Sequence, residues 1–325
     1  MDELDRLVGQ YSGSLLAIQA PEGLKARALE LSELLEAEDV RTVLIGDPCF
    51  GACNLADGDA AALGAAALVH LGHAPIPGTP TELPVHYIEF REEPDIGPAL
   101  DELKEILVSP VGLATTVQHI DMLDGVRTGL EDYGHTVLIG EKGGRVNYDG
   151  QVLGCDLATV HAIEEKVATF LFLGTGRFHP LGIALATGRP VVTLDPYTGE
   201  IDSLDNEQLL RQRYGAIGRA IDAKRIGILV APKGGQRRMA LATALKQEFN
   251  ENGRVPVLIS SDFVSPDFLL AFRLDALVIT SCPRIAFDDY ERFEIPVLTA
   301  TEARMLLKGV DALMDGEYVV DEFSE

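Results

Sequence analysis

The sequence predicts an α/β protein made of three similar small domains, each built on a parallel sheet. Apolar runs of strand length alternate with helical patterns along the chain, which is typical of parallel sheets covered on both faces. The pattern restarts twice. A proline precedes the fourth strand of each unit at a constant spacing of 106 residues (190 − 84 and 296 − 190): Pro84, Pro190 and Pro296. Because this period is too long for a solenoid repeat, each unit is expected to be a whole domain.

The first unit, residues 1–108, carries four apolar runs that predict strands. Proline ends the first run and introduces the last, as expected where a residue without a backbone N–H meets a strand end. The strands are expected at 15–20, 42–45, 67–71 and 85–90. Leu and Ala at helical spacing predict helices at 24–37, 60–66 and 96–107.

The second unit, residues 109–222, repeats this order. Strands are expected at 112–116, 136–140, 169–173 and 191–194. An amphipathic helix is expected at 119–133, ended by Gly134, and a polar loop over 141–150 leads to the short segment 151–155. A long helical segment, 206–224, is expected to connect to the third unit.

The third unit, residues 223–325, shows the pattern once more. Strands are expected at 226–231, 255–260, 276–280 and 297–299, and helices at 235–252 and 302–308. An acidic tail, 311–325, follows the last helix and is expected to be a solvated chain end.

Composition excludes several classes of protein. The chain of 325 residues is 46% hydrophobic, which is enough for sizeable cores. A net charge of −24 argues against a nucleic-acid binder, which needs a basic face. There is no apolar run long enough to span a membrane, and the acidic N-terminus lacks a signal-peptide core. We therefore expect a cytoplasmic protein with neither nucleic-acid nor membrane partners.

The chain has four cysteines, and three of them fall one per unit: Cys53, Cys155 and Cys282. Each stands beside a predicted strand end and next to Gly or Pro. If the three strand ends face a common centre, the thiols converge there. Thiols in a cytosolic chain are more often metal-binding, catalytic or inert than disulfide-bonded. The fourth, Cys49, is either a further ligand or a bystander.

Three converging thiolates leave more than one kind of centre open. Thiolates select iron–sulfur clusters, zinc or Cu(I). With three thiolates, one iron of a 4Fe–4S cluster has no protein ligand and can bind a substrate. Zinc prefers four ligands, and Cys49, Asp156 or a histidine could complete that set. Small buried cysteines without any metal are the remaining alternative.

Three segments resemble the archaeal enzymes for the first step of diphthamide biosynthesis, the 2-(3-amino-3-carboxypropyl)histidine synthases. The segments are Gly46-Asp-Pro-Cys-Phe-Gly-Ala-Cys53, Gly150-Gln-Val-Leu-Gly-Cys155 and Ser281-Cys282-Pro-Arg-Ile-Ala286. The resemblance covers essentially the whole chain. It implies a homodimer in which three α/β domains surround a 4Fe–4S cluster held by Cys53, Cys155 and Cys282. The family lacks the CxxxCxxC loop of standard radical S-adenosylmethionine enzymes, as does this sequence.

The activity that this resemblance implies is a group transfer. The 3-amino-3-carboxypropyl group of S-adenosylmethionine would pass to an imidazole carbon of one histidine on translation elongation factor 2. An electron from the reduced cluster would break the bond from sulfur to the methionine γ-carbon, and methylthioadenosine would leave. The resulting carbon radical would attack the imidazole, and an external electron donor would re-reduce the cluster.

Five residues are candidates for binding S-adenosylmethionine. Arg284 stands two residues past Cys282 and could hold the carboxylate, as a guanidinium does. Lys233 and Gln236 lie in a turn that opens a predicted helix and could present backbone N–H groups to an anion. Gly174 and Gly176 follow a strand and could line the adenosine site. No side chain is predicted to be catalytic, because the cluster acts, with Arg284 the one possible exception.

Some polar residues near these motifs could equally have ordinary structural roles. His73 and His179 lie in matching loops, each shortly before a proline, and could contact substrate or be hydrogen-bonded loop histidines. Asp156, beside Cys155, could be functional or a solvated carboxylate. Three rival functions also stay open: a lyase like quinolinate synthase, which has three α/β units and a three-cysteine cluster; a non-catalytic partner subunit; and a structural zinc protein.

Overall fold

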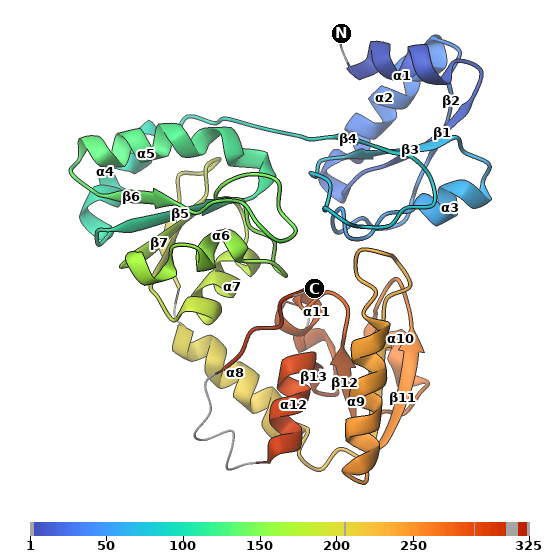
Figure 1. Ribbon diagram of the computed structural model, residues 1–325, viewed down its shortest axis with the longest axis vertical. Helices are drawn as coiled ribbons and strands as arrows, with labels where there is room; N and C mark the ends of the chain where they lie inside the picture. Colours follow the sequence, from blue (N-terminus) through green and yellow to red (C-terminus); the bar gives the residue numbers. More distant parts are fainter. Residues whose placement is uncertain (1–2, 205, 289, 310–317, 324–325) are drawn as a thin grey trace. The chain divides into compact units, whose positions relative to one another are not determined.

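The computed structural model describes residues 3–204, 206–288, 290–309 and 318–323. The chain forms two compact units. The first comprises Met1–Glu92, Arg145–Asn147 and Lys233–Gly235, and the second Glu93–Gly144, Tyr148–Pro232 and Gln236–Glu325. The first unit contains one sheet and the second contains two (Figure 1).

The first sheet has the order β2-β1-β3-β4, with every neighbour parallel. Its strands are β1 (Leu15–Gln19), β2 (Arg41–Leu44), β3 (Ala67–Leu71) and β4 (Val85–Ile88). The helices are α1 (Glu3–Tyr11), η1 (Glu22–Leu24), α2 (Lys25–Ala37) and α3 (Asp57–Ala62). Alternate residues of β1 face two different cores. Leu16 and Ile18 pack with α1 and α2, whereas Ala17 packs with α3, so helices cover both faces.

The second sheet has the order β6-β5-β7-β8-β9. Its strands are β5 (Val111–Thr115), β6 (Val137–Ile139), β7 (Thr169–Leu173), β8 (Val191–Leu194) and the antiparallel edge strand β9 (Ile201–Ser203). Its helices are α4 (Gly97–Ile106), η2 (Val117–Met122), α5 (Leu123–Asp132), α6 (Ala158–His161), η3 (Glu164–Lys166) and α7 (Phe178–Thr187). Leu171 of β7 faces a core shared with α4 and α5, whereas Phe170 and Phe172 face the core that includes α7.

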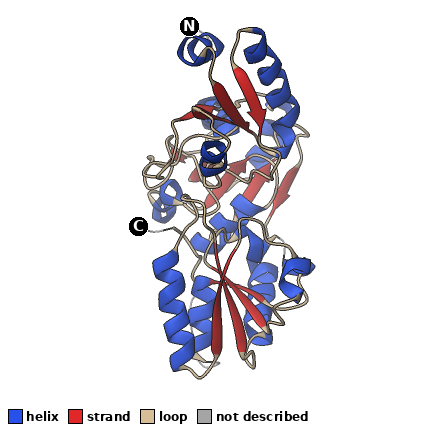
Figure 2. Ribbon diagram, turned by 90° about the vertical axis from the view of Figure 1, so that its right-hand side faces the viewer, coloured by secondary structure: helices blue, strands red, loops and turns tan. Residues whose placement is uncertain are grey.

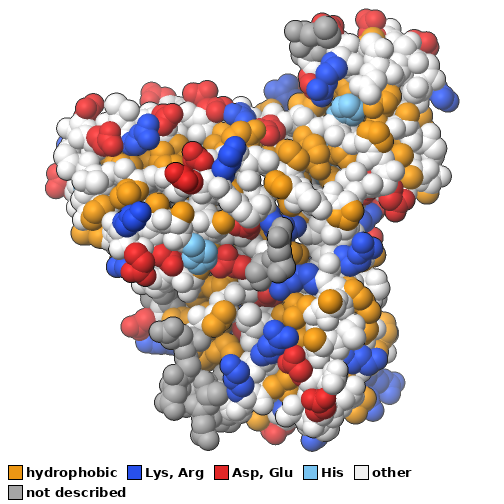
Figure 3. All heavy atoms as spheres, in the orientation of Figure 1, with side chains coloured by type: hydrophobic (Ala, Val, Ile, Leu, Met, Phe, Trp, Pro, Cys, Tyr) orange, Lys and Arg blue, Asp and Glu red, His pale blue; other side chains and the backbone are white. Residues whose placement is uncertain are grey.

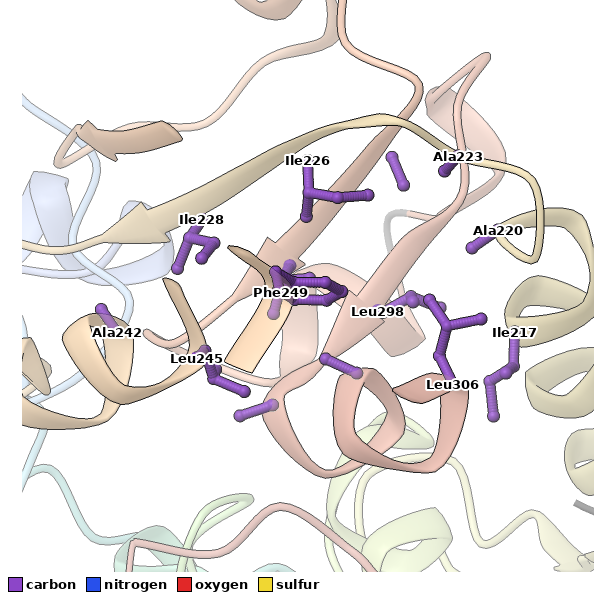
Figure 4. Close-up of a cluster of buried hydrophobic side chains, with 14 of the residues drawn as sticks. Ile217, Ala220, Ala223, Ile226, Ile228, Ala242, Leu245, Phe249, Leu298 and Leu306 are labelled. Atoms are coloured by element: carbon purple, nitrogen blue, oxygen red, sulfur yellow. The ribbon is translucent and has the colours of Figure 1, made fainter. Parts of the chain in front are cut away.

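The third sheet has the order β11-β10-β12-β13, again all parallel. Its strands are β10 (Arg225–Val230), β11 (Val255–Ser260), β12 (Ala276–Ile279) and β13 (Val297–Thr299). The helices are α8 (Asn206–Arg219), α9 (Met239–Glu251), α10 (Pro266–Leu270), α11 (Arg284–Phe287), η4 (Tyr290–Arg292) and α12 (Ala300–Lys308). Figure 2 shows helices on both sides of its fanned strands. On one face Phe249 of α9 and Leu306 of α12 pack with Ile226 and Leu298 (Figure 4).

The three sheets share one topology, which confirms the predicted triplicated α/β fold. When the strands are numbered along the chain within each sheet, the order is 2-1-3-4 each time, and β9 extends the second sheet. The repeated prolines have one structural role, because the carbonyl of each accepts a hydrogen bond from the second residue of the third strand. The pairs are Leu68 N to Pro84 O (3.0 Å), Phe170 N to Pro190 O (2.9 Å) and Leu277 N to Pro296 O (2.9 Å). The domain boundaries after residues 108 and 222 stay predictions.

The sequence patterns placed several helix ends inaccurately. The helix expected at 60–66 is α3, which begins at Asp57 and ends at Ala62, and Gly64 follows in a left-handed conformation with φ 78°. The helix expected at 235–252 begins only at Met239, because residues 233–237 form a turn. The short helices α1 and α7 and the edge strand β9 were not predicted.

The surface agrees with the acidic composition. On the face shown in Figure 3, acidic side chains are spread over much of the described surface, with basic and apolar side chains between them. Within the described part of the chain, no helix is both long and apolar enough to cross a membrane.

Candidate metal centre and cofactor site

The loop after β2 carries Cys53, which is half-buried, and Cys49, which is buried. The buried side chain of Gln19, at the end of β1, fixes the residues that follow Cys53. Its amide nitrogen donates to Asn54 O (2.8 Å), and its amide oxygen accepts from Ala56 N (3.1 Å). A strand end therefore determines where the Cys53 loop leaves the sheet.

The predicted Lys233 turn lies against this loop, within the first unit. A Cβ added at Gly235 would lie 2.5 Å from Cys53 Cα, so no larger residue fits there without moving backbone. Arg145 Nη2 donates to Gly235 O (2.6 Å), and Lys233 forms an ion pair with Asp59 of α3. The structure thus brings one predicted cofactor-binding motif next to one predicted cluster ligand.

Cys155 occupies the tip of a tight turn in the second unit. Leu153 and Asp156 close this turn with two backbone hydrogen bonds, N to O, of 3.0 and 3.2 Å. Asp156 is buried, and its side chain accepts from Ala158 N (2.9 Å) at the start of α6. A Cβ at Gly154 would lie 1.7 Å from the Phe178 ring, so glycine lets the turn approach that ring. Asp156 therefore has a structural role in holding this turn.

Cys282 follows β12 and lies just before α11. Its carbonyl accepts from Ile285 N (3.3 Å) in the turn that starts the helix. Arg284 donates to Asp288 (2.8 Å), and its guanidinium lies 5.7 Å from the centroid of the Phe178 ring. Phe178 therefore contacts both the Cys155 turn and the residue two positions past Cys282, which brings these two thiol-bearing segments to one ring.

The described C-terminal residues, 318–323, correct the expectation of a solvated tail. Phe323 N donates to Cys155 O (2.8 Å), and a Glu322 carboxylate oxygen accepts from Leu157 N (3.0 Å). Asp321 is 2% exposed and pairs with Arg238 (2.9 Å). The carboxylates of this segment accept specific hydrogen bonds from the protein. The segment therefore supports the Cys155 turn. Residues 311–317 of the predicted tail lie outside the described residues.

Arg238 is a candidate that the sequence patterns did not single out. It caps the N-terminus of α9, and its guanidinium lies 4.5 Å from the centroid of the Phe323 ring. Among the described residues, its Nη1 is the buried side-chain nitrogen that has no hydrogen-bond partner. Such a nitrogen is costly to bury and is suited to receive an anionic group. Arg238 directly follows the predicted Lys233 turn, and this position is the sequence feature by which it could have been identified. Gln236, in the same turn, is buried.

Gly174 and Gly176 form the turn after β7, with φ values of 149° and 76° that favour glycine. Gly174 N donates to Leu194 O (3.0 Å), so this turn is fixed to the neighbouring strand. His179, at the start of α7, stacks on Phe172 with ring centroids 5.9 Å apart.

His73 takes part in a buried polar cluster that includes His70, which was not predicted. His70 Nε2 and His73 Nδ1 are 3.0 Å apart, and His70 Nδ1 lies 3.1 Å from the Gln19 amide oxygen. Burial lowers the pKa of His70 to about 3 and that of His73 to about 4. Burial likewise raises the pKa of the nearby Cys49 thiol to about 11. All three groups are therefore uncharged at neutral pH.

The residues at the three predicted ligands are suited to an iron–sulfur cluster. Cys53, Cys155 and Cys282 are each half-buried. The two glycines at positions 154 and 235 permit close packing around the first two, since a Cβ at either would clash. Phe178 and Phe323 both contact the Cys155 turn, and thiolates are the ligands that hold iron–sulfur clusters.

Comparison with known sequences indicates one protein family. The sequence profile of the diphthamide synthesis protein family matches residues 20–319. The 2-(3-amino-3-carboxypropyl)histidine synthase of Pyrococcus horikoshii is 38% identical over 293 residues, covering 89% of this chain and 84% of the relative. The synthase of Methanocaldococcus jannaschii is 28% identical, covering 94% and 87%. Subunit 1 of the synthase of Schizosaccharomyces pombe is 31% identical, covering 89% and 68%.

Solved structures agree with these relatives. The crystal structure of Dph2 from Pyrococcus horikoshii with a 4Fe–4S cluster has a TM-score of 0.89 at 35% identity, covering 98% of this chain and 91% of that one. A second structure of the same protein has the same score and covers 92% of that chain. The relatives carry the enzyme name that the resemblance implied, which confirms the prediction of an enzyme. With its family profile, its relatives and its fold in agreement, this chain belongs to the diphthamide synthesis family.

Proposed function

We propose that the chain transfers the 3-amino-3-carboxypropyl group of S-adenosylmethionine to an imidazole carbon of one histidine of translation elongation factor 2. The observation that carries this proposal is the 38% identity, over 89% of the chain, to a synthase named for the same modified histidine. Cytoplasmic location, a homodimer and an external electron donor belong to the same proposal.

Cys53, Cys155 and Cys282 would hold the 4Fe–4S cluster. Such a cluster, when bound through three thiolates, supplies an open iron for the methionine part of the cofactor and the electron that breaks its sulfur–γ-carbon bond. The turns that carry the thiols support this role through their rigidity. Each is fixed by backbone hydrogen bonds or by a glycine contact that leaves little room for other residues.

Two arginines of the second compact unit, Arg238 and Arg284, are suited to bind the carboxylate of the cofactor. Arg238 offers an unpartnered buried nitrogen and lies over Phe323, whose backbone bonds Cys155. Arg284 is 52% exposed and already paired with Asp288, so it would have to exchange one carboxylate for another. The cost of leaving a buried donor unpaired favours Arg238 for direct binding. Arg284 is then placed to assist from the side of Phe178.

The other predicted residues would contact the cofactor without reacting. The Gly174 and Gly176 turn offers backbone without side chains, which suits close approach of an adenosine. Lys233 and Gln236 come from the turn that lies beside Cys53 and continues into α9. Phe178 and Phe323 present apolar rings near Cys155, and these would exclude water from the carbon radical.

The proposal is tested with the full chain prepared without oxygen. Dithionite and S-adenosylmethionine should yield methylthioadenosine, and elongation factor 2 should gain the labelled 3-amino-3-carboxypropyl group. Elongation factor 2 with the target histidine replaced is the control and should stay unlabelled. Release of 5′-deoxyadenosine as the main product would contradict the proposed bond cleavage. If no S-adenosylmethionine is consumed, the reaction is a different one, such as that of a cluster-dependent lyase.

A further inference from the structure

Three potential metal ligands lie together in the first unit, outside the three predicted cluster ligands. The Cys49 sulfur and one nitrogen each of His70 and His73 are within 4.8 Å of one another. Cys49 comes from the loop after β2, His70 lies near the end of β3, and His73 follows that strand by two residues. Cys49 and His70 are buried and His73 is half-buried, so the group has one side nearer to solvent.

The hydrogen bonds of Gln19 fix the protonation of His70. The amide nitrogen of Gln19 faces the Asn54 carbonyl and its oxygen faces the Ala56 N–H, which settles the orientation of the amide. His70 Nδ1, 3.1 Å from that oxygen, must therefore carry the proton and donate it. His70 Nε2 is left with a lone pair, directed at His73. A histidine held by one nitrogen with the other bare is the usual state of a metal ligand.

The donor set and its spacing suit zinc. Zinc binds thiolate at about 2.3 Å and imidazole nitrogen at about 2.0–2.1 Å in a tetrahedron, which puts two nitrogens about 3.3 Å apart. The two imidazole nitrogens are now 3.0 Å apart, so they need to separate by only a few tenths of an ångström. The Gly51 N–H already bonds the Cys49 sulfur, as is common for a metal thiolate.

We propose that Cys49, His70 and His73 form a mononuclear site for a zinc-type divalent cation, separate from the predicted cluster. Its fourth position lies on the half-buried side of His73 and takes water. On binding, the metal replaces the hydrogen bond between the histidines: the proton that His73 Nδ1 donates to His70 moves to His73 Nε2, and the thiol proton of Cys49 is released to solvent. The site ties the loop that carries Cys53 to the end of β3. It does not depend on the proposed transfer reaction, and it gives Cys49 a role of its own.

The test uses the full chain with its cluster, prepared anaerobically and titrated with Co²⁺ and then Zn²⁺. We expect one Co²⁺ per chain with thiolate-to-cobalt absorption, which Zn²⁺ displaces. X-ray absorption at the zinc edge should show one sulfur and two imidazole neighbours. The Cys49→Ser and His73→Gln variants should lose this binding and keep their iron. His86→Gln is a matched control, because His86 is a half-buried histidine of the same unit that bonds Tyr11 instead.

Two further variants distinguish this site from the cluster and from a chance grouping of side chains. Gln19→Met removes the acceptor of His70 and should lower Co²⁺ affinity by about 10–100-fold, whereas Gln19→Glu keeps that acceptor and should retain most of it. Cys155→Ala should bind Co²⁺ with its thiolate absorption unchanged. The proposal is overturned if Cys49→Ser binds Co²⁺ like the unaltered chain. It is equally overturned if the unaltered chain binds none, or if the absorption disappears in Cys155→Ala.

Discussion

The Cys53 loop and the Cys155 turn are held in place by different means. Gln19, from a strand of the same sheet, fixes the Cys53 loop, and Gly235 packs directly on its backbone. The Cys155 turn is instead bonded by the C-terminal segment, more than a hundred residues away in sequence, through Phe323. Equivalent thiols in a triplicated fold thus have no equivalent supports. A substitution in one support should therefore weaken one ligand and spare the other.

Removing Asp321 should have the largest effect, because it leaves Arg238 without its carboxylate partner. Asp321 is almost fully buried, and breaking a buried ion pair costs about 3–5 kcal/mol, less here because Arg238 is partly exposed. We expect Asp321→Ala to lower the free energy of unfolding in urea by roughly 3 kcal/mol. Cluster content should fall with it, since the segment also bonds Cys155.

Val319→Ala is the control for this segment, because Val319 is 56% exposed and should change stability little. Equal effects of Asp321→Ala and Val319→Ala would mean that the C-terminal segment does not support the Cys155 turn.

Arg238→Lys should weaken cofactor binding while leaving the fold intact. Lysine keeps a positive charge for Asp321 but lacks the second nitrogen that is proposed to bind the carboxylate. The loss of one charged hydrogen bond, about 1.5–3 kcal/mol, corresponds to a roughly 10–150-fold rise in the KM for S-adenosylmethionine. Iron content should stay unchanged. Arg284→Lys is the matched variant. A larger rise in KM for Arg284→Lys than for Arg238→Lys would mean that Arg284, and not Arg238, binds the carboxylate.

Gly235→Ala should disturb the Cys53 loop and leave the Cys155 turn unchanged. The added methyl would lie 2.5 Å from Cys53 Cα and 2.7 Å from its carbonyl oxygen, so backbone must shift. We expect a loss of about 1–3 kcal/mol in unfolding free energy together with reduced cluster content. Gly218→Ala, where a methyl meets nothing within 4 Å, should be neutral or slightly stabilising. If Gly235→Ala keeps the stability and iron of the unaltered chain, the Lys233 turn does not constrain Cys53.

The contact of the C-terminal segment with His161 should also stabilise the fold less at alkaline pH, by a small amount. The protonated ring of His161 donates hydrogen bonds to the carboxylate of Glu322 and, with a smaller effect, to that of Glu164, and these raise the pKa of His161 to about 9 against the effect of burial. The stabilisation is fully present below the unfolded pKa of about 6.5 and is lost as the pH rises through about 9. Because His161 is 38% exposed, solvent screening reduces it to roughly 1 kcal/mol or less.

Urea midpoints at pH 6.5 and pH 9.5 measure this effect, and His161→Gln should remove the difference. His135→Gln, whose ring bonds the Lys104 carbonyl instead, should retain it. A pH dependence that survives in His161→Gln would assign it to other groups.

The sequence allowed the fold to be predicted, because parallel strands buried on both faces read as continuous apolar runs. The constant spacing of Pro84, Pro190 and Pro296 reflects one repeated backbone hydrogen bond. Helix ends were less accurate. The turn at residues 233–237 contains two glycines, and Gly235 packs against the Cys53 backbone, so the helix begins only after this turn.

The supports of the thiols could not be read from local patterns. Phe323 and Cys155 have no sequence relation that composition or periodicity reveals, and their bond uses backbone atoms alone. The acidic tail looked solvated because its charges have no neighbours in sequence, whereas Arg238 and Leu157 meet Asp321 and Glu322 in space. His70 was missed for a similar reason, since its environment comes from Gln19.

Iron and sulfide analysis tests most directly the proposal that Cys53, Cys155 and Cys282 hold one 4Fe–4S cluster. The unaltered chain, prepared anaerobically, should contain about four iron and four sulfide per chain. Cys155→Ala should lose the cluster while keeping its fold, and Cys49→Ala should retain it. A chain that contains zinc alone, or a Cys155→Ala variant with an unchanged cluster, would contradict the account.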